Sequence, residues 1–206
     1  MRMNMSDLFL RCLSADYESL SQDESYAIEA THDTLFLYFE GSNGCKDWKR
    51  NFDFPIKRCG SDCSSFCHRG FFGAWENIKP YVINQISDKS FNEIYVVGYS
   101  HGAAIALLCY EFCKSVRADI SIHGYGFGCP RVFWGGGRKK IRKLFDTFTV
   151  IRNANDIVTY LPPALLGYFH VGKILKIGSK GKYSTIDAHR PENILNELNE
   201  YEKATE

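Results

Sequence analysis

The stretch IYVVGYSHGAA, residues 94–104, carries the signal that decides the fold of this chain. An apolar run rich in β-branched residues enters Gly-x-Ser-x-Gly, and small residues that suit a closely packed helix follow at once. A serine at the tip of such a sharp strand-to-helix turn has a strained backbone, and the residues two positions away must lack bulk. Gly98 and Gly102 occupy those positions and let the strand and the helix pass closely. The pattern predicts that Ser100 is a nucleophile presented to solvent, beside helix N–H groups that can stabilise an oxyanion.

Strands and helices alternate along the rest of the sequence. A strand at 93–98, a helix at 101–116, and strands near 120–127 and 147–152 surround the serine motif. This alternation predicts an α/β fold with a central, mostly parallel sheet and helices on both faces. Helices are also expected at residues 6–20, 71–86, 138–145 and 191–203, and strands at 25–30, 34–39, 52–56, 168–177 and 182–186. With 206 residues and no linker-like stretch, the chain is expected to form a single domain, residues 1–206.

The charge of the chain argues against a polyanionic partner. The formal net charge is +1, so no nucleic acid is expected to bind. One basic cluster is present, which consists of Arg138, Lys139, Lys140, Arg142 and Lys143. We interpret it as a solvated helix face, with transient contact to an anionic membrane surface, or contact to a nucleic acid, as the alternative.

The first residues do not have the pattern of a secretory signal peptide. Asp7 and Arg11 interrupt the only apolar run near the start of the sequence, and no apolar stretch is long enough to span a bilayer. A cytoplasmic location is therefore expected, with the eight cysteines mostly present as reduced thiols.

A serine nucleophile needs a base and an acid that orients the base. On a sheet that carries this motif, the chain order is serine, then acid, then histidine. Asp156 follows the strand 147–152, where the carboxyl end of a parallel strand places site residues. Two candidates remain for the base. His170 lies in an apolar, strand-like run, whereas His189 lies in a polar loop before a helix, and loops carry catalytic residues more often. We therefore favour His189, and His170 stays open as the alternative.

Several motifs in the correct order resemble those of the class 3 lipase family, the fungal-type triacylglycerol lipases of the α/β-hydrolase fold. The resemblance extends from about residue 33 to residue 190. The motifs are Leu35–Ser42, Asp47-Trp48, His68-Arg69-Gly70-Phe71, Gly98–Gly102, Phe127–Val132, Asn155–Pro163 and His170-Val171-Gly172.

The resemblance implies an α/β-hydrolase fold and a serine hydrolase mechanism. It implies that the backbone N–H groups of Ser42 and His101 form the oxyanion hole, and that His170 is structural, which supports His189 as the base. The expected activity is the hydrolysis of carboxylic esters, on a small-molecule or lipid ester, through a covalent acyl-enzyme. The polar segment 43–67 lacks a long apolar helix, which favours an esterase over a lipase that acts at an oil surface. The oligomeric state is not indicated.

Two other functions fit the same residues. The first is acyl transfer or thioester hydrolysis on the same Ser-Asp-His triad, because the motif does not identify the acyl acceptor. The second is a catalytically silent member that binds a lipid or a protein.

Three cysteines and a histidine form a further cluster of candidate ligands. Cys59, Cys63, Cys67 and His68 have the spacing Cys-x3-Cys-x3-Cys, without the Cys-x2-Cys pair that is typical of structural zinc sites. We therefore expect ordinary thiols, and neither a metal nor another cofactor is required by the proposed chemistry.

Overall fold

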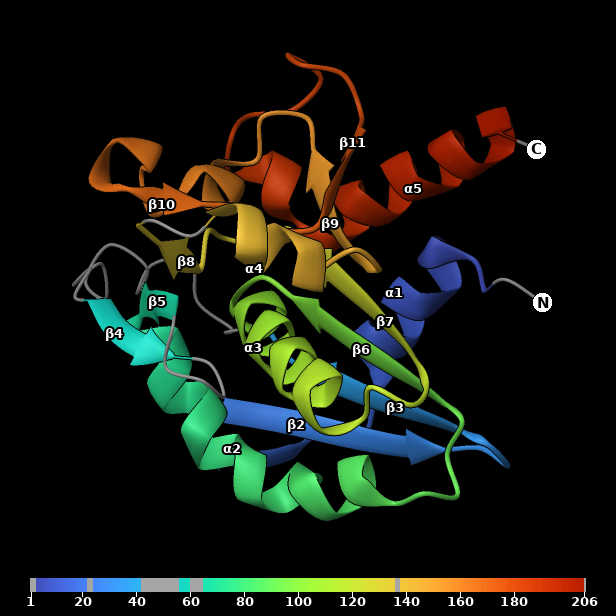
Figure 1. Ribbon diagram of the computed structural model, residues 1–206. Coiled ribbons are helices and arrows are strands. Elements are labelled where there is room, and N and C mark those ends of the chain that lie inside the picture. Colours follow the sequence, from blue (N-terminus) through green and yellow to red (C-terminus); the bar gives the residue numbers. More distant parts are fainter. Residues whose placement is uncertain (1–2, 22–23, 42–55, 60–64, 136–137, 206) are drawn as a thin grey trace.

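A computed structural model describes residues 3–21, 24–41, 56–59, 65–135 and 138–205 (Figure 1). A seven-stranded sheet forms its centre, in the order β1-β2-β3-β6-β7-β9-β11. The four pairs from β3 to β11 are parallel, and the two pairs at the β1 edge are antiparallel. The strands of this sheet are β1 (Glu18–Ser21), β2 (Glu24–Ala30), β3 (Thr34–Phe39), β6 (Glu93–Tyr99), β7 (Ser121–Phe127), β9 (Phe148–Asn153) and β11 (Lys173–Ile177). The prediction of a central, mostly parallel sheet is confirmed.

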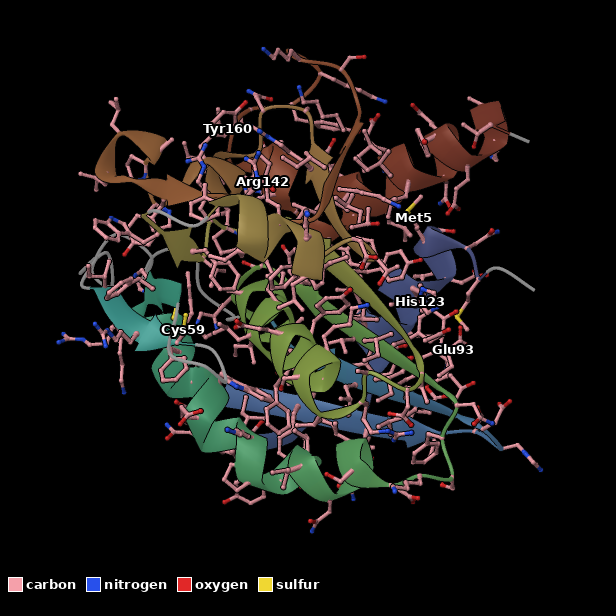
Figure 2. All side chains as sticks on the ribbon, viewed as in Figure 1. Met5, Cys59, Glu93, His123, Arg142 and Tyr160 are labelled. Carbon is pink, nitrogen blue, oxygen red and sulfur yellow. The ribbon has the colours of Figure 1, made fainter. Side chains whose placement is uncertain are left out.

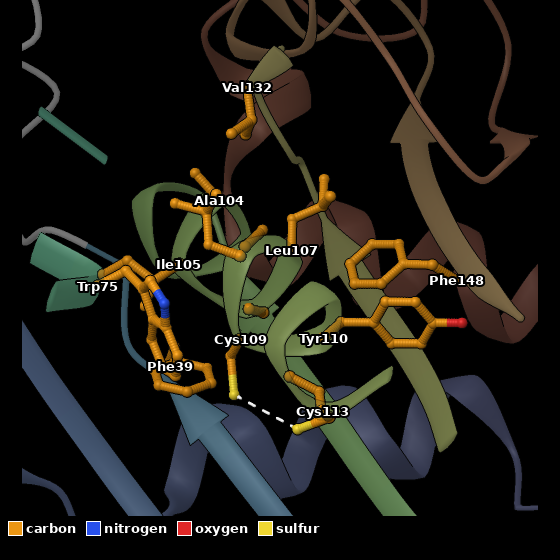
Figure 3. Packing of buried hydrophobic residues seen from close by; sticks show 14 of the residues in the cluster. Phe39, Trp75, Ala104, Ile105, Leu107, Cys109, Tyr110, Cys113, Val132 and Phe148 are labelled. Carbon is orange, nitrogen blue, oxygen red and sulfur yellow. Dashed lines mark hydrogen bonds between the residues drawn. The ribbon is translucent and has the colours of Figure 1, made fainter. Parts of the chain in front are cut away.

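Helices cover both faces of this sheet, as the alternation predicted. The helices are α1 (Met5–Ser14), α2 (Arg69–Ser87), α3 (His101–Val116), α4 (Arg138–Leu144) and α5 (Pro191–Thr205). Apolar side chains of α2, α3 and α4 pack on one face, and those of α1 and α5 form a second core on the other. The central helix α3 is buried along most of its length, and Figure 3 shows Ala104, Leu107 and Tyr110 packed within the first core. The sheet therefore holds α3, and with it the serine motif, in a rigid setting.

A smaller, four-stranded sheet lies beside the central one. Its order is β10-β8-β5-β4, and all of its pairs are antiparallel. Its strands are β4 (Ile56–Cys59), β5 (Ser65–His68), β8 (Phe133–Trp134) and β10 (Tyr168–Phe169). Most of the strand expected at 52–56 falls outside the described residues.

Three expectations for secondary structure were wrong. The helix expected at 6–20 ends at Ser14, and residues 18–21 instead form β1, because they pair with β2 in an antiparallel hairpin. The strand expected at 168–177 is divided into β10 and β11 at Gly172, whose φ of +77° breaks the extended backbone. Residues 182–186 are turn rather than strand.

Candidate active site

The serine motif forms a sharp turn between β6 and α3. Its two glycines are required because a larger residue would clash with the backbone. A Cβ on Gly98 would lie 2.3 Å from the carbonyl oxygen of Gly102, and a Cβ on Gly102 would lie 2.1 Å from that of Phe39. No side chain fits at either position. Ser100 itself has φ 56° and ψ −120°, a strained conformation that the surrounding strand and helix impose. The steric argument for the Gly-x-Ser-x-Gly spacing therefore holds in the structure.

Three of the predicted site residues lie in one hydrogen-bonded row. The hydroxyl of Ser100 is 2.8 Å from Nε2 of His189, and Nδ1 of the same imidazole is 2.8 Å from Oδ2 of Asp156. Asp156 follows β9, and its Oδ1 accepts a hydrogen bond of 2.9 Å from the backbone N–H of Val158. One carboxylate oxygen therefore accepts a hydrogen bond from its own loop, and the other accepts one from the imidazole. Since a carboxylate only accepts, Nδ1 of His189 carries a proton, and Nε2 of the neutral ring can accept one from Ser100.

All three side chains are buried, which differs from one expectation. Ser100 is 2 % exposed, His189 3 % and Asp156 0 %. The sequence had predicted a hydroxyl presented to solvent, and this was wrong because the Ser100 hydroxyl faces the imidazole.

The other histidines lie outside this row. Nε2 of His170 is 2.7 Å from the carbonyl oxygen of Thr159 and donates a hydrogen bond to it. Burial lowers the pKa of His170 to about 4, and the nearby guanidinium groups of Arg131 and Arg152 add to the effect. His123 pairs with Glu93, 3.0 Å away, at the beginning of β6 and thus at the opposite end of that strand from Ser100 (Figure 2).

The proposed oxyanion hole is only partly described. His101 is the first residue of α3 and directly follows Ser100, so its backbone N–H belongs to the N-terminal turn of the helix. Such N–H groups are suited to stabilise a negative charge. Ser42 lies outside the described residues.

The turn that carries His189 has partners that the sequence analysis missed. The Tyr99 hydroxyl donates to the carbonyl oxygen of His189 over 2.7 Å, and the Asn153 side-chain amide donates to that of Ala188 over 2.9 Å. The sequence indicated these partners only through their positions near two site residues. Tyr99 directly precedes Ser100, and Asn153 ends the strand before Asp156.

The cysteine cluster is described in part. Cys59 and Cys67 are buried free thiols, Cys63 lies outside the described residues, and Figure 2 shows Cys59 at the small sheet. Within the described ranges, no group of three or more potential ligands of the His, Cys, Asp and Glu type comes together.

The basic residues 138–143 form most of α4. Among the helices of the described chain, none has the length and hydropathy of a membrane span.

Comparisons with known proteins agree on one family. The model of the family Lipase (class 3) matches residues 36–166, which is more than half of the chain. The secreted mono- and diacylglycerol lipase A of Penicillium cyclopium is 27% identical over 149 residues, covering 70% of this chain and 48% of the relative. The secreted mono- and diacylglycerol lipase 1 of Fusarium solani is 27% identical over 140 residues, covering 66% of this chain and 41% of the relative. This chain thus spans about half, or less, of the length of these relatives.

A solved structure shows the same fold. It is that of a triacylglycerol lipase whose catalytic centre is described as a serine protease triad, with a TM-score of 0.69 and 24% identity over 79% of this chain and 65% of that one. The fold expected from the sequence, that of the α/β-hydrolases, is therefore correct. The prediction of a cytoplasmic location is contradicted, because both relatives are named as secreted. The matched family model shows that this chain belongs to the class 3 lipases.

Proposed function

We propose that this protein is a serine hydrolase of carboxylic esters, with Ser100 as nucleophile, His189 as base and Asp156 as the acid that orients the base. One observation carries the proposal: two consecutive hydrogen bonds of 2.8 Å connect the hydroxyl, the imidazole and the carboxylate. Such a row is what a serine nucleophile needs, because an alcohol attacks a carbonyl only when a base takes its proton.

The geometry supports a two-step acyl transfer. Ser100 attacks the acyl carbon while its proton moves to Nε2 of His189, and the resulting imidazolium is stabilised by Asp156 across the Nδ1 hydrogen bond. The imidazolium then returns the proton to the leaving alcohol, which gives the acyl-enzyme. A water molecule, activated by the same imidazole, releases the acid and restores Ser100.

The tetrahedral intermediates carry a negative oxygen that requires hydrogen-bond donors. We assign these to the backbone N–H groups of His101 and Ser42, the former at the N-terminus of α3. No protein-bound metal or other cofactor enters this sequence of steps.

The proposed substrate is a lipid ester, because both relatives are named secreted mono- and diacylglycerol lipases. Large apolar side chains are exposed on the loops that carry the acid and precede the base: Ile157, Leu165, Leu166 and Ile186. Nearby, the guanidinium of Arg152 lies 3.7 Å above the ring of Tyr160, without a carboxylate partner among the described side chains. Exposed apolar side chains beside a positive charge support transient contact with an anionic lipid surface.

Vesicle flotation tests the proposed lipid contact. Leu165→Ser with Leu166→Ser is expected to reduce co-flotation with vesicles that contain an anionic phospholipid. Leu10 and Leu13 on α1 are also exposed, at 46 % and 40 %, so Leu10→Ser with Leu13→Ser is the control for loss of exposed leucines elsewhere. Equal flotation of both double variants would remove the contact from the proposal.

The alternatives differ in how the structure bears on them. An acyltransferase or thioesterase would use the same triad, and the identity of the acceptor distinguishes it. A silent member that only binds a lipid or a protein has no need of the aligned triad, so the geometry favours an enzyme. We also retain the proposal that residues 1–206 form a single domain.

The test of the activity is turnover of p-nitrophenyl esters of short and long acyl chains, with labelling by a fluorophosphonate. Ser100→Ala is expected to lose labelling and about 10^6-fold in kcat. Ser115 is an exposed serine on the same helix, and Ser115→Ala is expected to retain both. Turnover that persists in Ser100→Ala would contradict the proposal, and transfer to an added alcohol in preference to water would favour the acyltransferase.

A further inference from the structure

The base of the proposed triad lies on an unusually small structural element. His189 ends η4 (Asp187–His189), a three-residue 3-10 turn between β11 and α5. A turn this short leaves its carbonyl groups largely without partners inside the turn. Each of its three carbonyl oxygens accepts a hydrogen bond from the side chain of a different element. The donors are Asn193 to Asp187 (2.8 Å), Asn153 to Ala188 (2.9 Å) and Tyr99 to His189 (2.7 Å).

Tyr99 contacts His189 twice. Its hydroxyl binds the carbonyl oxygen of His189, and its ring stacks on the imidazole with centroids 5.2 Å apart and planes inclined by 23°. The tyrosine ring is itself confined. Phe9 packs edge-on against it at 5.7 Å, and a Cβ on Gly41 would lie 2.7 Å from the ring. The ring therefore has little room to move, and it holds both the backbone and the side chain of the base.

Asn153 holds the same turn from another strand. It is the last residue of β9, it is fully buried, and it lies three residues before Asp156. Its side-chain amide reaches the carbonyl oxygen of Ala188, next to the one that Tyr99 binds.

We infer that Tyr99 and Asn153 are positioning residues for the base, an inference that rests on the proposed function. Tyr99 is adjacent to Ser100, and Asn153 is close to Asp156, so each donor belongs to the strand end that carries one of the other two triad members. A small displacement of either strand end moves the His189 turn with it. The imidazole thereby stays within hydrogen-bond distance of the hydroxyl and the carboxylate at once.

Tyr99→Phe tests this arrangement most directly, because it keeps the stacked ring and removes only the hydroxyl. With p-nitrophenyl esters, kcat is expected to fall about tenfold while KM stays within about twofold, since a misplaced base slows the chemical step and not binding. Tyr17 is a matched control, because its hydroxyl also donates to a backbone carbonyl, that of Cys12, over 2.6 Å. Tyr17→Phe is expected to leave kcat within about twofold of the wild type.

A second measurement does not depend on turnover. The proton between Nδ1 of His189 and Asp156 is expected to give a downfield signal in the 1H NMR spectrum. Tyr99→Phe is expected to broaden or shift that signal, and Tyr17→Phe is not. Asn153→Asp keeps the size of the side chain, removes the amide donor and is expected to act in the same direction. If Asn153→Asp does not fold, Tyr99→Phe decides the inference.

The outcomes separate the inference from the proposed function. A folded Tyr99→Phe with wild-type kcat and an unchanged His189 signal would overturn the inference. A wild-type protein without turnover or labelling would instead contradict the proposed function, and the His189 signal in Tyr99→Phe would then decide the positioning role alone.

Discussion

Two buried histidines, His170 and His189, lie close in sequence and have opposite surroundings. Both are largely hidden from solvent, at 9 % and 3 % exposure. His170 donates from Nε2 to a backbone carbonyl, and its buried Nδ1 has no hydrogen-bond partner among the residues that the structure describes. His189 instead has a carboxylate on one nitrogen and a hydroxyl on the other. Burial therefore does not distinguish the proposed base from the other histidine; the chemistry of the two partners does.

The two environments favour different proton states. A proton added to Nδ1 of His170 would be desolvated and would find no acceptor in the described part of the chain, so burial favours the neutral ring. A proton added to Nε2 of His189 is stabilised by Asp156 across the ring. His170 therefore suits a structural role and His189 suits the transfer of protons.

The largest expected difference comes from replacing each histidine by glutamine. His189→Gln is expected to lose about 10^6-fold in kcat, because the base itself is absent. His170→Gln places an amide donor near the position of Nε2, keeps the bond to the Thr159 carbonyl, and is expected to retain kcat within about threefold. Steady-state turnover of p-nitrophenyl esters measures both kcat values, with circular dichroism as the control for folding. A large loss in His170→Gln with intact folding would break the distinction between the two sites.

A smaller effect is expected from two glycines: Gly128, which packs against His189, and Gly172, which lies two residues after His170. Gly128 and Gly172 both have a positive φ, at +58° and +77°. A Cβ on Gly128 would lie 2.7 Å from Cε1 of His189, whereas a Cβ on Gly172 would lie 2.5 Å from the carbonyl oxygen of Phe148. Gly128→Ala is therefore expected to displace the imidazole and lower kcat about 100-fold.

Gly172→Ala is the matched variant for that change. It is expected to lower the free energy of unfolding by about 3 kcal/mol while the folded enzyme keeps its kcat, because the strain and the clash are with backbone. Denaturant titration and kcat, measured on both variants, check the pair. If Gly172→Ala lost kcat as strongly as Gly128→Ala, the two surroundings would not be functionally distinct.

The sequence was sufficient for those parts of the fold that depend on local patterns. The helix expected at 101–116 is α3, and the strand expected at 93–98 is β6, because strong apolar periodicity and the flanking glycines act over a few residues. The helix expected at 6–20 was wrong beyond residue 14, because residues 18–21 form a strand. Their strand is stabilised by pairing with β2, which is a contact that the local pattern does not contain.

The site was predictable to a similar extent. Chain order and strand ends indicated Ser100 and Asp156, and the preference for loops favoured His189, the histidine that lies against Ser100. Tyr99 and Asn153 could not be assigned, because their acceptor carbonyls are 90 and 35 residues away in the sequence. Such partners are set by packing of the whole chain, which no motif reports.

The smallest effect that we expect concerns protonation of His170. Its pKa is lowered from 6.5 to about 4, mainly by burial, so the unfolded chain binds a proton between these values that the folded protein does not bind. The free energy of unfolding therefore falls as the pH is lowered through 6.5, and this contribution stops changing below about pH 4. From pH 6.5 to 5 the loss amounts to about 2 kcal/mol. His170→Gln lacks the group that titrates, so its free energy of unfolding should depend less on pH by this amount.

Urea titrations of the wild type and His170→Gln at pH 7, 6 and 5 measure that difference directly. Other titrating groups contribute equally to both proteins, so the difference between the two curves isolates position 170. Parallel curves would mean that His170 accepts a proton in the folded state as readily as in the unfolded chain. Nδ1 of His170, which has no hydrogen-bond partner among the described residues, would then need an acceptor in the folded protein.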